Sequence, residues 1–494
     1  MKYSFDKNAS GTHFEPYYLK CICAGRAYEG LRADWQKQLK TVQEEIGFEY
    51  IRFHGIFNDE MAVYTEDENG EPKFFWQYFD KLFDFLKEVG LKPIFELSFM
   101  PEAISTVPHT LFWWRGNACP PTDYDKWAKL VEATVKHCIE RYGIDYVLDW
   151  KWEVWNEPNL SSFWTGTMEE YFKLYKYSVL AIKGVDKRLS VGGPSSSGAD
   201  FRDDLNYVKE FIKYCSKNEL PVDFISAHPY PTYWPLDTNG NERMGYMDKE
   251  CTVRHLDEIR KTVDNSPYPD AQIHLTEFNS SPSPRDLIHD TMFTAAFLLY
   301  NLTKNIGKAD SLGFWTFTDI FEENGPGESQ FHGGFGLINS IGIKKPSYYA
   351  YKILSQMGNE LIYLDENSFV TKNDGKLHIL LYNYCYYKDD FASGDRSKLS
   401  LLERDDVFEE KVLNIDLDIQ NAKDITSYRL SNKEGSALHN WIALGAPENP
   451  SVEQTEELIK SSDLKEFSFN GNITLSPNEI VYMRSPAAKS PMPS

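Results

Sequence analysis

The stretch that decides the fold is VLDWKWEVWNE, residues 147–157, which is followed directly by a proline. Apolar and polar residues alternate along it, which is the period of two expected for a β-strand with two different faces. Its last residues, Asn156 and Glu157, are polar and gain little from burial in a core. We therefore expect this strand to end where a sheet meets solvent.

Seven further runs have the character of strands, and amphipathic segments separate them along the chain. The segments between the runs place apolar residues three and four apart and often end in glycine, which is typical of helices. Eight strands in strict alternation with helices predict an α/β fold, a (β/α)₈ TIM barrel, whose chemistry lies at the C-terminal ends of the strands. The seven other runs are residues 18–25, 50–57, 92–100, 189–197, 222–230, 272–280 and 312–320.

The pattern changes after the last predicted barrel helix. Segments there alternate with a period of two and are broken by Asn, Asp and Gly, as in an antiparallel sandwich. We predict a catalytic barrel at 15–358 and an all-β, sandwich-like accessory domain at 359–494, to which 1–14 are candidates to belong. The charged stretch 397–411 is expected to be a loop or a solvated edge, and the tail 487–494 to be disordered.

The composition excludes several classes of partner. The formal net charge of −22 would repel nucleic acid and anionic membranes. Seven scattered cysteines, none in a C-x-x-C pair, favour free thiols and a reducing compartment. No apolar leader and no run long enough to span a bilayer are visible, so we expect a cytoplasmic location. An acidic barrel with an aromatic-rich β domain is compatible with a homo-oligomer.

Polar and titratable side chains gather at the predicted strand ends. In a barrel these ends share one opening, so residues far apart in sequence are expected to meet there. Residues two apart on a strand also share a face, as do Arg52 with His54 and His228 with Tyr230. The gathered residues are Arg52, His54, Asn156, Glu157, His228, Tyr230 and Glu277, with Trp315, Glu322 and Glu323 at the eighth strand and in the loop after it.

Glu157 and Glu277 end strands four and seven, which face each other across a closed barrel. Two opposed carboxyl groups are the minimum equipment for cleaving a glycosidic bond, because one protonates the leaving oxygen and the other attacks the anomeric carbon or activates water. A separation of about 5 to 5.5 Å is typical of retaining enzymes and about 6.5 to 9.5 Å of inverting ones. The alternative is that Glu157 and Glu277 are ordinary glutamates in ion pairs. Glu153 is the main other candidate for the acid.

Several segments resemble glycoside hydrolase family 39 of clan A, and within it the bacterial β-xylosidases. The resemblance covers the barrel and extends more weakly into the β domain. The segments are FEYIRFHGIF, WEVWNEPNLSSFW, LSVGGPSSSGAD, PVDFISAHPY, HLTEFNSS and FWTFTDIFEE followed by SQFHGGFGL.

The resemblance implies roles for the gathered residues. Glu157 would be the acid/base and Glu277 the nucleophile of a retaining mechanism. Asn156 would hydrogen-bond the sugar 2-hydroxyl, and Tyr230 would hydrogen-bond the nucleophile and keep it ionised. The remaining matches are His54, His228, Glu322 and Glu323, which would hold ring hydroxyls, and Trp315, which would form the aromatic floor beneath the ring.

The activity implied by the resemblance is a retaining exo-β-glycosidase, in first place a β-D-xylosidase acting on small xylo-oligosaccharides from the non-reducing end. It needs neither a metal nor an organic cofactor. The alternatives are a β-glucosidase or α-L-arabinosidase of the same family, or a non-catalytic carbohydrate-binding barrel. Paired cysteines in the first strand and Pro229 between His228 and Tyr230 depart from the family pattern. Both departures lie near the expected pocket. The resemblance therefore supports the reaction class more directly than the choice of sugar.

Overall fold

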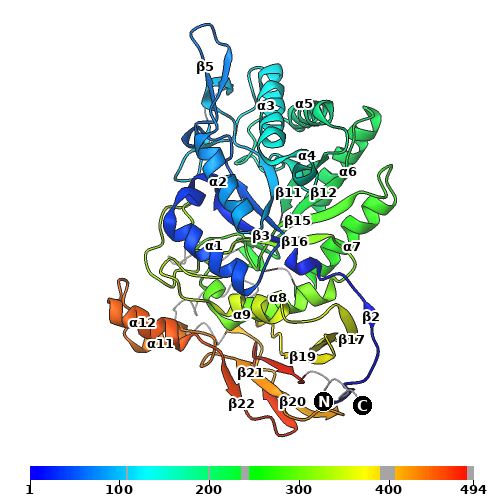
Figure 1. Ribbon diagram of the computed structural model, residues 1–494, viewed down its shortest axis with the longest axis vertical. Coiled ribbons are helices and arrows are strands. Elements are labelled where there is room, and N and C mark those ends of the chain that lie inside the picture. Colours follow the sequence, from blue (N-terminus) through cyan, green and yellow to red (C-terminus); the bar gives the residue numbers. More distant parts are fainter. Residues whose placement is uncertain (107–108, 199–200, 235–243, 247, 390–406, 487–494) are drawn as a thin grey trace, which may run out of the picture.

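The computed structural model places a barrel of parallel strands at one end of the molecule and antiparallel sheets at the other (Figure 1). No helix within the described part of the chain is long and apolar enough to cross a membrane. The described residues are 1–106, 109–198, 201–234, 244–246, 248–389 and 407–486.

Eight parallel strands close into the barrel, with β16 pairing back onto β3 through Gly313 and Cys21. This confirms the predicted (β/α)₈ barrel and all eight strand positions, although several strands are shorter than their sequence runs. The barrel strands, in chain order, are β3 (Cys21–Arg26), β4 (Tyr50–His54), β7 (Lys92–Leu97), β10 (Lys151–Val154), β11 (Ser190–Gly198), β12 (Phe224–Pro229), β15 (Gln272–Phe278) and β16 (Ser311–Phe314).

Helices follow the strands and surround the barrel (Figure 1). Asp123 caps the third of them by accepting from two backbone N–H groups, and Thr167 with Glu170 forms a capping box on the fifth. The helices are α1 (Ala33–Glu45), α2 (Gln77–Glu88), α3 (Tyr124–Tyr142), α4 (Ile144–Val147), α5 (Met168–Val185), α6 (Phe201–Lys217), α7 (Cys251–Asp264), α8 (Met292–Lys304) and α9 (Pro346–Leu354).

Short elements occupy the loops between these units. Three of the loops carry two-stranded hairpins, and short 3₁₀ helices lie in several loops, two of them in the same loops as hairpins. They are β5 (Tyr64–Glu66) with β6 (Pro72–Phe74), β8 (Thr110–Leu111) with β9 (Gly116–Asn117), β13 (Thr232–Trp234) with β14 (Met244–Tyr246), and η1 (Tyr17–Leu19), η2 (Ala27–Leu31), η3 (Asp59–Met61), η4 (Glu102–Ile104) and η5 (Leu287–Asp290).

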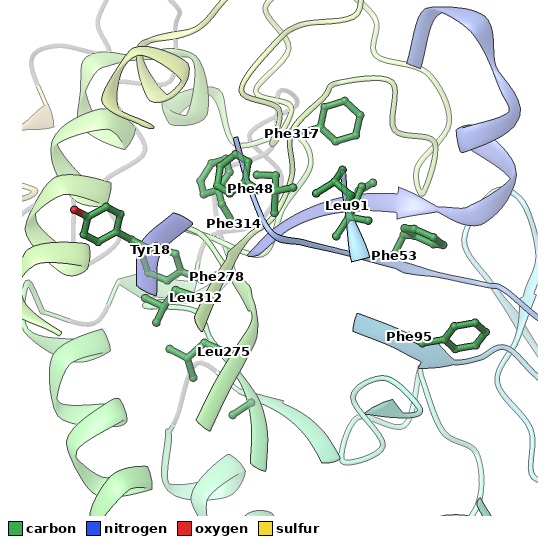
Figure 2. Close-up of a cluster of buried hydrophobic side chains, with 14 of the residues drawn as sticks. Tyr18, Phe48, Phe53, Leu91, Phe95, Leu275, Phe278, Leu312, Phe314 and Phe317 are labelled. Atoms are coloured by element: carbon green, nitrogen blue, oxygen red, sulfur yellow. The ribbon is translucent and has the colours of Figure 1, made fainter. Parts of the chain in front are cut away.

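The main hydrophobic core lies between the barrel strands and the helices around them. Figure 2 shows part of it, with Phe53, Phe95 and Leu275 on three different strands. Because side chains alternate along a strand, the neighbours Arg52 on β4 and Glu96 on β7 point to the inside of the barrel instead. The barrel therefore has an apolar outer face and a charged interior.

Two antiparallel-rich sheets pack together in the C-terminal region. The N-terminal strand β1 (Lys2–Asp6) pairs with β20 (Leu413–Gln420), and β2 (Thr12–His13) pairs with β17 (Glu360–Leu364). The boundary at 358–359 stays a prediction. The other strands here are β18 (Ser368–Asn373), β19 (Lys376–Tyr382), β21 (Thr426–Leu430), β22 (Lys465–Phe467), β23 (Asn472–Leu475) and β24 (Ile480–Arg484).

The C-terminal region is not purely β, which corrects one detail of our expectation. Helices α11 (Leu438–Ala443) and α12 (Val452–Ser461) lie between β21 and β22. Trp441 and Leu458 pack with Phe331 from the loop after the eighth barrel strand, so the helices bury an apolar face against the barrel side. Most of the charged stretch 397–411, and all of the tail 487–494, lie outside the described residues.

Candidate active site

A cavity of about 530 Å³ opens where the barrel strands end. Its walls come from strands and loops spread over the whole barrel, as expected for a site at the C-terminal face. Six of the predicted site residues line it: His54, Glu157, Tyr230, Glu277, Trp315 and Glu323.

Glu157 is placed by a sharp change of backbone direction after β10. Trp155 has φ of 72° and Glu157 of 46°, both in the left-handed region that side chains rarely adopt. The Glu157 N–H donates to the carbonyl of Ser195 at 2.9 Å, and Asn159 Oδ1 accepts from the backbone of Ser197 at 2.9 Å. These bonds tie the turn to the neighbouring strand, so the strand ends at Val154 and Glu157 faces the cavity.

Burial dominates the electrostatics of Glu157. The side chain is almost wholly enclosed, and loss of solvation raises its pKa from 4.5 to about 7. Such a carboxyl group holds a proton near neutral pH and can give it up again, which is what a general acid and base requires.

Glu277 on β15 has the opposite environment. Arg52 donates through Nη1 to its Oε1 at 2.7 Å, and the Tyr230 hydroxyl donates to its Oε2 at 2.8 Å. A guanidinium and a hydroxyl thus direct one donor at each of the two carboxylate oxygens. A carboxylate held in this way has the surroundings that a nucleophile requires.

Arg52 connects the carboxylates inside the barrel. Its guanidinium lies 2.7 Å from Glu96 and 2.7 Å from Glu153 as well as from Glu277, and every one of these side chains is buried. Its Nη2 also donates to Asn156 Oδ1 at 2.7 Å. One cation thus holds three acidic side chains in place. Glu153, the rival for the acid, is bound in this cluster below the cavity.

The two candidate carboxyl groups lie close together. One oxygen of Glu157, one oxygen of Glu277 and a ring nitrogen of His228 all fall within 4.8 Å of one another. This upper bound on the distance between the two oxygens is compatible with the carboxyl spacing of retaining glycosidases. The same three groups could chelate a cation, but we do not assign them as metal ligands, because Arg52 already supplies the positive charge at Glu277.

Asn156 and His228 are fully buried just behind the cavity wall. His228 Nδ1 lies 2.9 Å from Glu157 Oε1, and burial lowers the pKa of its imidazole to about 4. The Nδ2 donor of Asn156 has no hydrogen-bond partner among the described residues. His228 therefore contacts the candidate acid, where we had expected it to hold ring hydroxyls.

The adjacent glutamates Glu322 and Glu323 have different surroundings. Glu323 lines the cavity with His54 Nε2 at 3.6 Å, and burial raises the pKa of its carboxyl group well above the usual range. Glu322 does not line the cavity among the described residues. Its carboxylate pairs with Arg26 at 2.9 Å and Arg32 at 2.7 Å. The structure therefore brings only one of this predicted pair into the site.

Sequence reasoning missed an apolar wall of the cavity. In the segment LFWWRGN, residues 111–117, Trp113 is 62% exposed, whereas its neighbour Phe112 lines the cavity. Phe112 and Phe163 meet edge to face at 5.5 Å. Phe163 follows the Asn-Glu-Pro turn by only a few residues, and that proximity is the signal that could have found it. The other apolar residues of the wall are Leu160, Pro282 and Pro284.

Comparisons with known proteins agree with this geometry. The family model described as glycosyl hydrolases family 39 matches residues 1–470. The chain belongs to glycoside hydrolase family 39. Membership makes it a glycoside hydrolase, an enzyme class that acts on sugar chains.

Three relatives of this family 39 chain are similar over most of their length. A β-xylosidase of Caldicellulosiruptor saccharolyticus is 38% identical over 94% of this chain and 92% of its own. A β-xylosidase of Geobacillus stearothermophilus is 34% identical over 90% of this chain and 86% of its own. The crystal structure of a monomeric β-xylosidase from Caulobacter crescentus superimposes with a TM-score of 0.88 at 30% identity, covering 99% of this chain and 100% of that one.

Proposed function

We propose that this chain is a retaining, exo-acting β-D-xylosidase that releases xylose from the non-reducing ends of small xylo-oligosaccharides. The observation that carries the proposal is the pair Glu157 and Glu277. Both line one cavity, and one oxygen of each lies within 4.8 Å of the other. Glu157 is set apart by burial, whereas Glu277 accepts from Arg52 and Tyr230. The similarity to β-xylosidases at 34% and 38% identity supports xylose as the glycone.

In the first step Glu277 attacks the anomeric carbon while Glu157 protonates the leaving oxygen. The pKa of about 7 keeps Glu157 protonated at mildly acidic pH, and Arg52 and Tyr230 each direct a donor at one oxygen of the attacking Glu277 carboxylate. The glycosidic bond breaks, and a covalent ester forms between Glu277 and the sugar.

In the second step Glu157, now a carboxylate, takes a proton from water as the water oxygen attacks the same carbon. The ester bond breaks, Glu277 leaves as a carboxylate, and two inversions give net retention. Tyr230 and Arg52 stabilise the departing carboxylate because their donors are already in place.

Substrate binding is assigned to the residues around this pair. The unpartnered Nδ2 of Asn156 is the donor we assign to the sugar 2-hydroxyl. His54 and Glu323 line the cavity and are assigned to other ring hydroxyls, with Trp315 as the aromatic floor. The apolar wall that contains Phe112 lines the same cavity. We assign it the role of limiting the size of the sugar and of the leaving group.

A panel of aryl glycosides tests the function. We expect turnover of aryl β-D-xylosides well above that of the matching β-glucosides and α-L-arabinosides, with β-xylose as the first product in NMR spectra. Higher activity on a glucoside or arabinoside would move the assignment to those activities, and α-xylose as first product would exclude retention. A protein that binds xylo-oligosaccharides without turnover of any glycoside would be a carbohydrate-binding barrel.

A further inference from the structure

Beyond the two catalytic carboxyl groups, a buried chain of hydrogen bonds links Glu153, Thr276, His228 and Glu157. We propose that Thr276 is a positioning residue that holds His228 in the tautomer with a bare Nδ1, so that Glu157 keeps its proton until the leaving oxygen takes it. This inference rests on the proposed role of Glu157 as the acid. Its evidence is the direction of each hydrogen bond, taken in order along the chain.

The first bond fixes the proton of Thr276. Glu153 pairs with Arg52 through Oε2 at 2.7 Å, and neither side chain has any solvent exposure. In this ion pair with a guanidinium, Glu153 is the acceptor, and carboxylate oxygens only accept hydrogen bonds. Thr276 Oγ1 lies 2.7 Å from the other oxygen, Oε1. The Thr276 hydroxyl must therefore donate to Glu153.

The second bond fixes the tautomer of His228. Its Nε2 lies 3.0 Å from Thr276 Oγ1. Because the Thr276 proton is directed at Glu153, only lone pairs of Oγ1 face the ring, and Nε2 must carry the hydrogen. Ser195 Oγ lies 3.0 Å from Nε2 and accepts from Arg52. Its hydroxyl can either accept from the ring or donate to it, so Thr276 is the group that selects the tautomer. Burial keeps the imidazole neutral, so its single proton is on Nε2 and Nδ1 is bare.

The third contact fixes the proton of Glu157. The bare Nδ1 lies 2.9 Å from Glu157 Oε1. A nitrogen lone pair and a carboxylate oxygen at that distance would repel, whereas a protonated Glu157 donates to the nitrogen. His228 thus stabilises the acid form of Glu157. The opposite tautomer would donate to the carboxylate and stabilise the base form.

Charged groups on several elements also affect the protonation equilibrium of Glu157. Burial raises the pKa of Glu157, and the charge of Glu96 acts in the same direction. A hydrogen bond from the Ser197 side chain and the charges of His54 and Arg52 on β4 favour the ionised form. After proton transfer the Glu157 carboxylate has no donor from His228, which makes it a stronger base toward water. The acidic groups facing this region are Glu96 on β7, Glu153 on β10, Glu277 on β15 and Glu323 after β16.

The test compares Thr276→Val, which lacks the hydroxyl, with Thr276→Ser, which keeps it. The matched control is Thr134→Val, an equally buried threonine on α3 that bonds only within its helix. In Thr276→Val the ring is free to turn its proton to Nδ1. We expect the apparent pKa of the alkaline limb of the kcat/KM profile to fall by about one pH unit or more. In Thr276→Ser and Thr134→Val it should stay close to the wild-type value.

Two substrates with different leaving groups distinguish a loss of positioning from general structural damage. Turnover of xylobiose, which needs the acid, should fall about tenfold or more in Thr276→Val, because general acid catalysis contributes about 10²- to 10⁴-fold. A dinitrophenyl xyloside, whose leaving group needs little protonation, should lose far less in kcat/KM. Equal losses on both substrates with an unmoved alkaline limb would overturn the proposal.

A measurement without turnover tests the tautomer directly. Nitrogen-15 NMR of the labelled wild-type protein, with His228 assigned by its loss in His228→Asn, should show a protonated Nε2 and a bare Nδ1. A protonated Nδ1 would overturn the proposal even if Thr276→Val fails to fold. If no β-xyloside is turned over by the wild type, the proposed function fails, whereas the tautomer is still decided by this spectrum.

Discussion

The Tyr230 hydroxyl donates a hydrogen bond of 2.8 Å to Oε2 of Glu277. The other oxygen of this carboxylate accepts from Arg52 at 2.7 Å, so each oxygen has its own donor before any substrate is bound. Donors that are already oriented stabilise developing charge without reorganisation. In the mechanism proposed above, these donors would serve Glu277 both when it attacks and when it leaves.

Removing the Tyr230 hydroxyl should slow the second step most. In Tyr230→Phe the departing Glu277 carboxylate loses one donor, and a hydrogen bond to a charged group is worth about 1.5 to 3 kcal/mol, or roughly 10- to 100-fold in rate. With a dinitrophenyl xyloside we expect kcat and KM to fall together, with a burst of dinitrophenol. Tyr146→Phe, which loses only a bond to the Leu91 carbonyl, is the control. A normal kcat would contradict the assignment.

Alanine variants of the two glutamates should separate their roles. Glu157→Ala should still form the glycosyl-enzyme from a dinitrophenyl xyloside and then stall, because no base activates water. Azide should rescue it and give the β-linked xylosyl azide. Glu277→Ala should be nearly inactive, with azide replacing the missing nucleophile and giving the α-linked product. NMR of the isolated azides identifies the anomer, and the reverse pairing of variant and product would show that the roles are exchanged.

The raised pKa of Glu157 predicts the pH dependence. The acid must be protonated in the free enzyme, and burial places its pKa at about 7. For xylobiose, kcat/KM should therefore be maintained below pH 7 and fall as the pH rises through that value. Glu157→Gln should abolish this limb together with most of the activity. A limb near 4.5, the ordinary value for glutamate, would show that Glu157 is solvated in the working enzyme.

The adjacent residues Glu322 and Glu323 should respond differently to the same change. Glu323→Gln alters a side chain that lines the cavity, so we expect at least a tenfold loss in kcat/KM for xylosides. Glu322→Gln weakens pairs with Arg26 and Arg32 outside the cavity and should change kcat/KM much less. Steady-state kinetics on both variants checks this. A larger loss in Glu322→Gln would mean that the loop rearranges when substrate binds.

Lys345 should matter for stability. Its ammonium group is fully buried between Asp290 at 2.7 Å and Asp319 at 2.6 Å. Lys345→Ala leaves two buried carboxylates without their cation, which costs about 3 to 5 kcal/mol in free energy of unfolding. The partly exposed pair of Lys344 with Glu45 is worth about 0 to 1 kcal/mol, so Lys344→Ala is the control. Thermal and urea unfolding should rank the variants in this order, and equal midpoints would contradict it.

Local patterns predicted much of this molecule. The period of two and the spacing of helical apolar residues located all eight barrel strands, since alternation along a strand directly reflects its two faces. The pairs Arg52 with His54 and His228 with Tyr230 followed from the same period. Helices α11 and α12 were missed, because they are short and pack against Phe331, a residue far away from them in the sequence.

The sequence by itself determined that Asn156 and Glu157 lie at the C-terminal end of the barrel, because polar residues that directly follow an alternating strand come where the barrel opens. The tertiary structure decided what those residues do there. Glu322 and Glu323 are neighbours in sequence, yet only Glu323 lines the cavity, because Arg26 and Arg32 from the first βα unit hold Glu322 outside it. Burial and charge depend on groups that meet only when the barrel closes, and they alone separate an acid from a nucleophile.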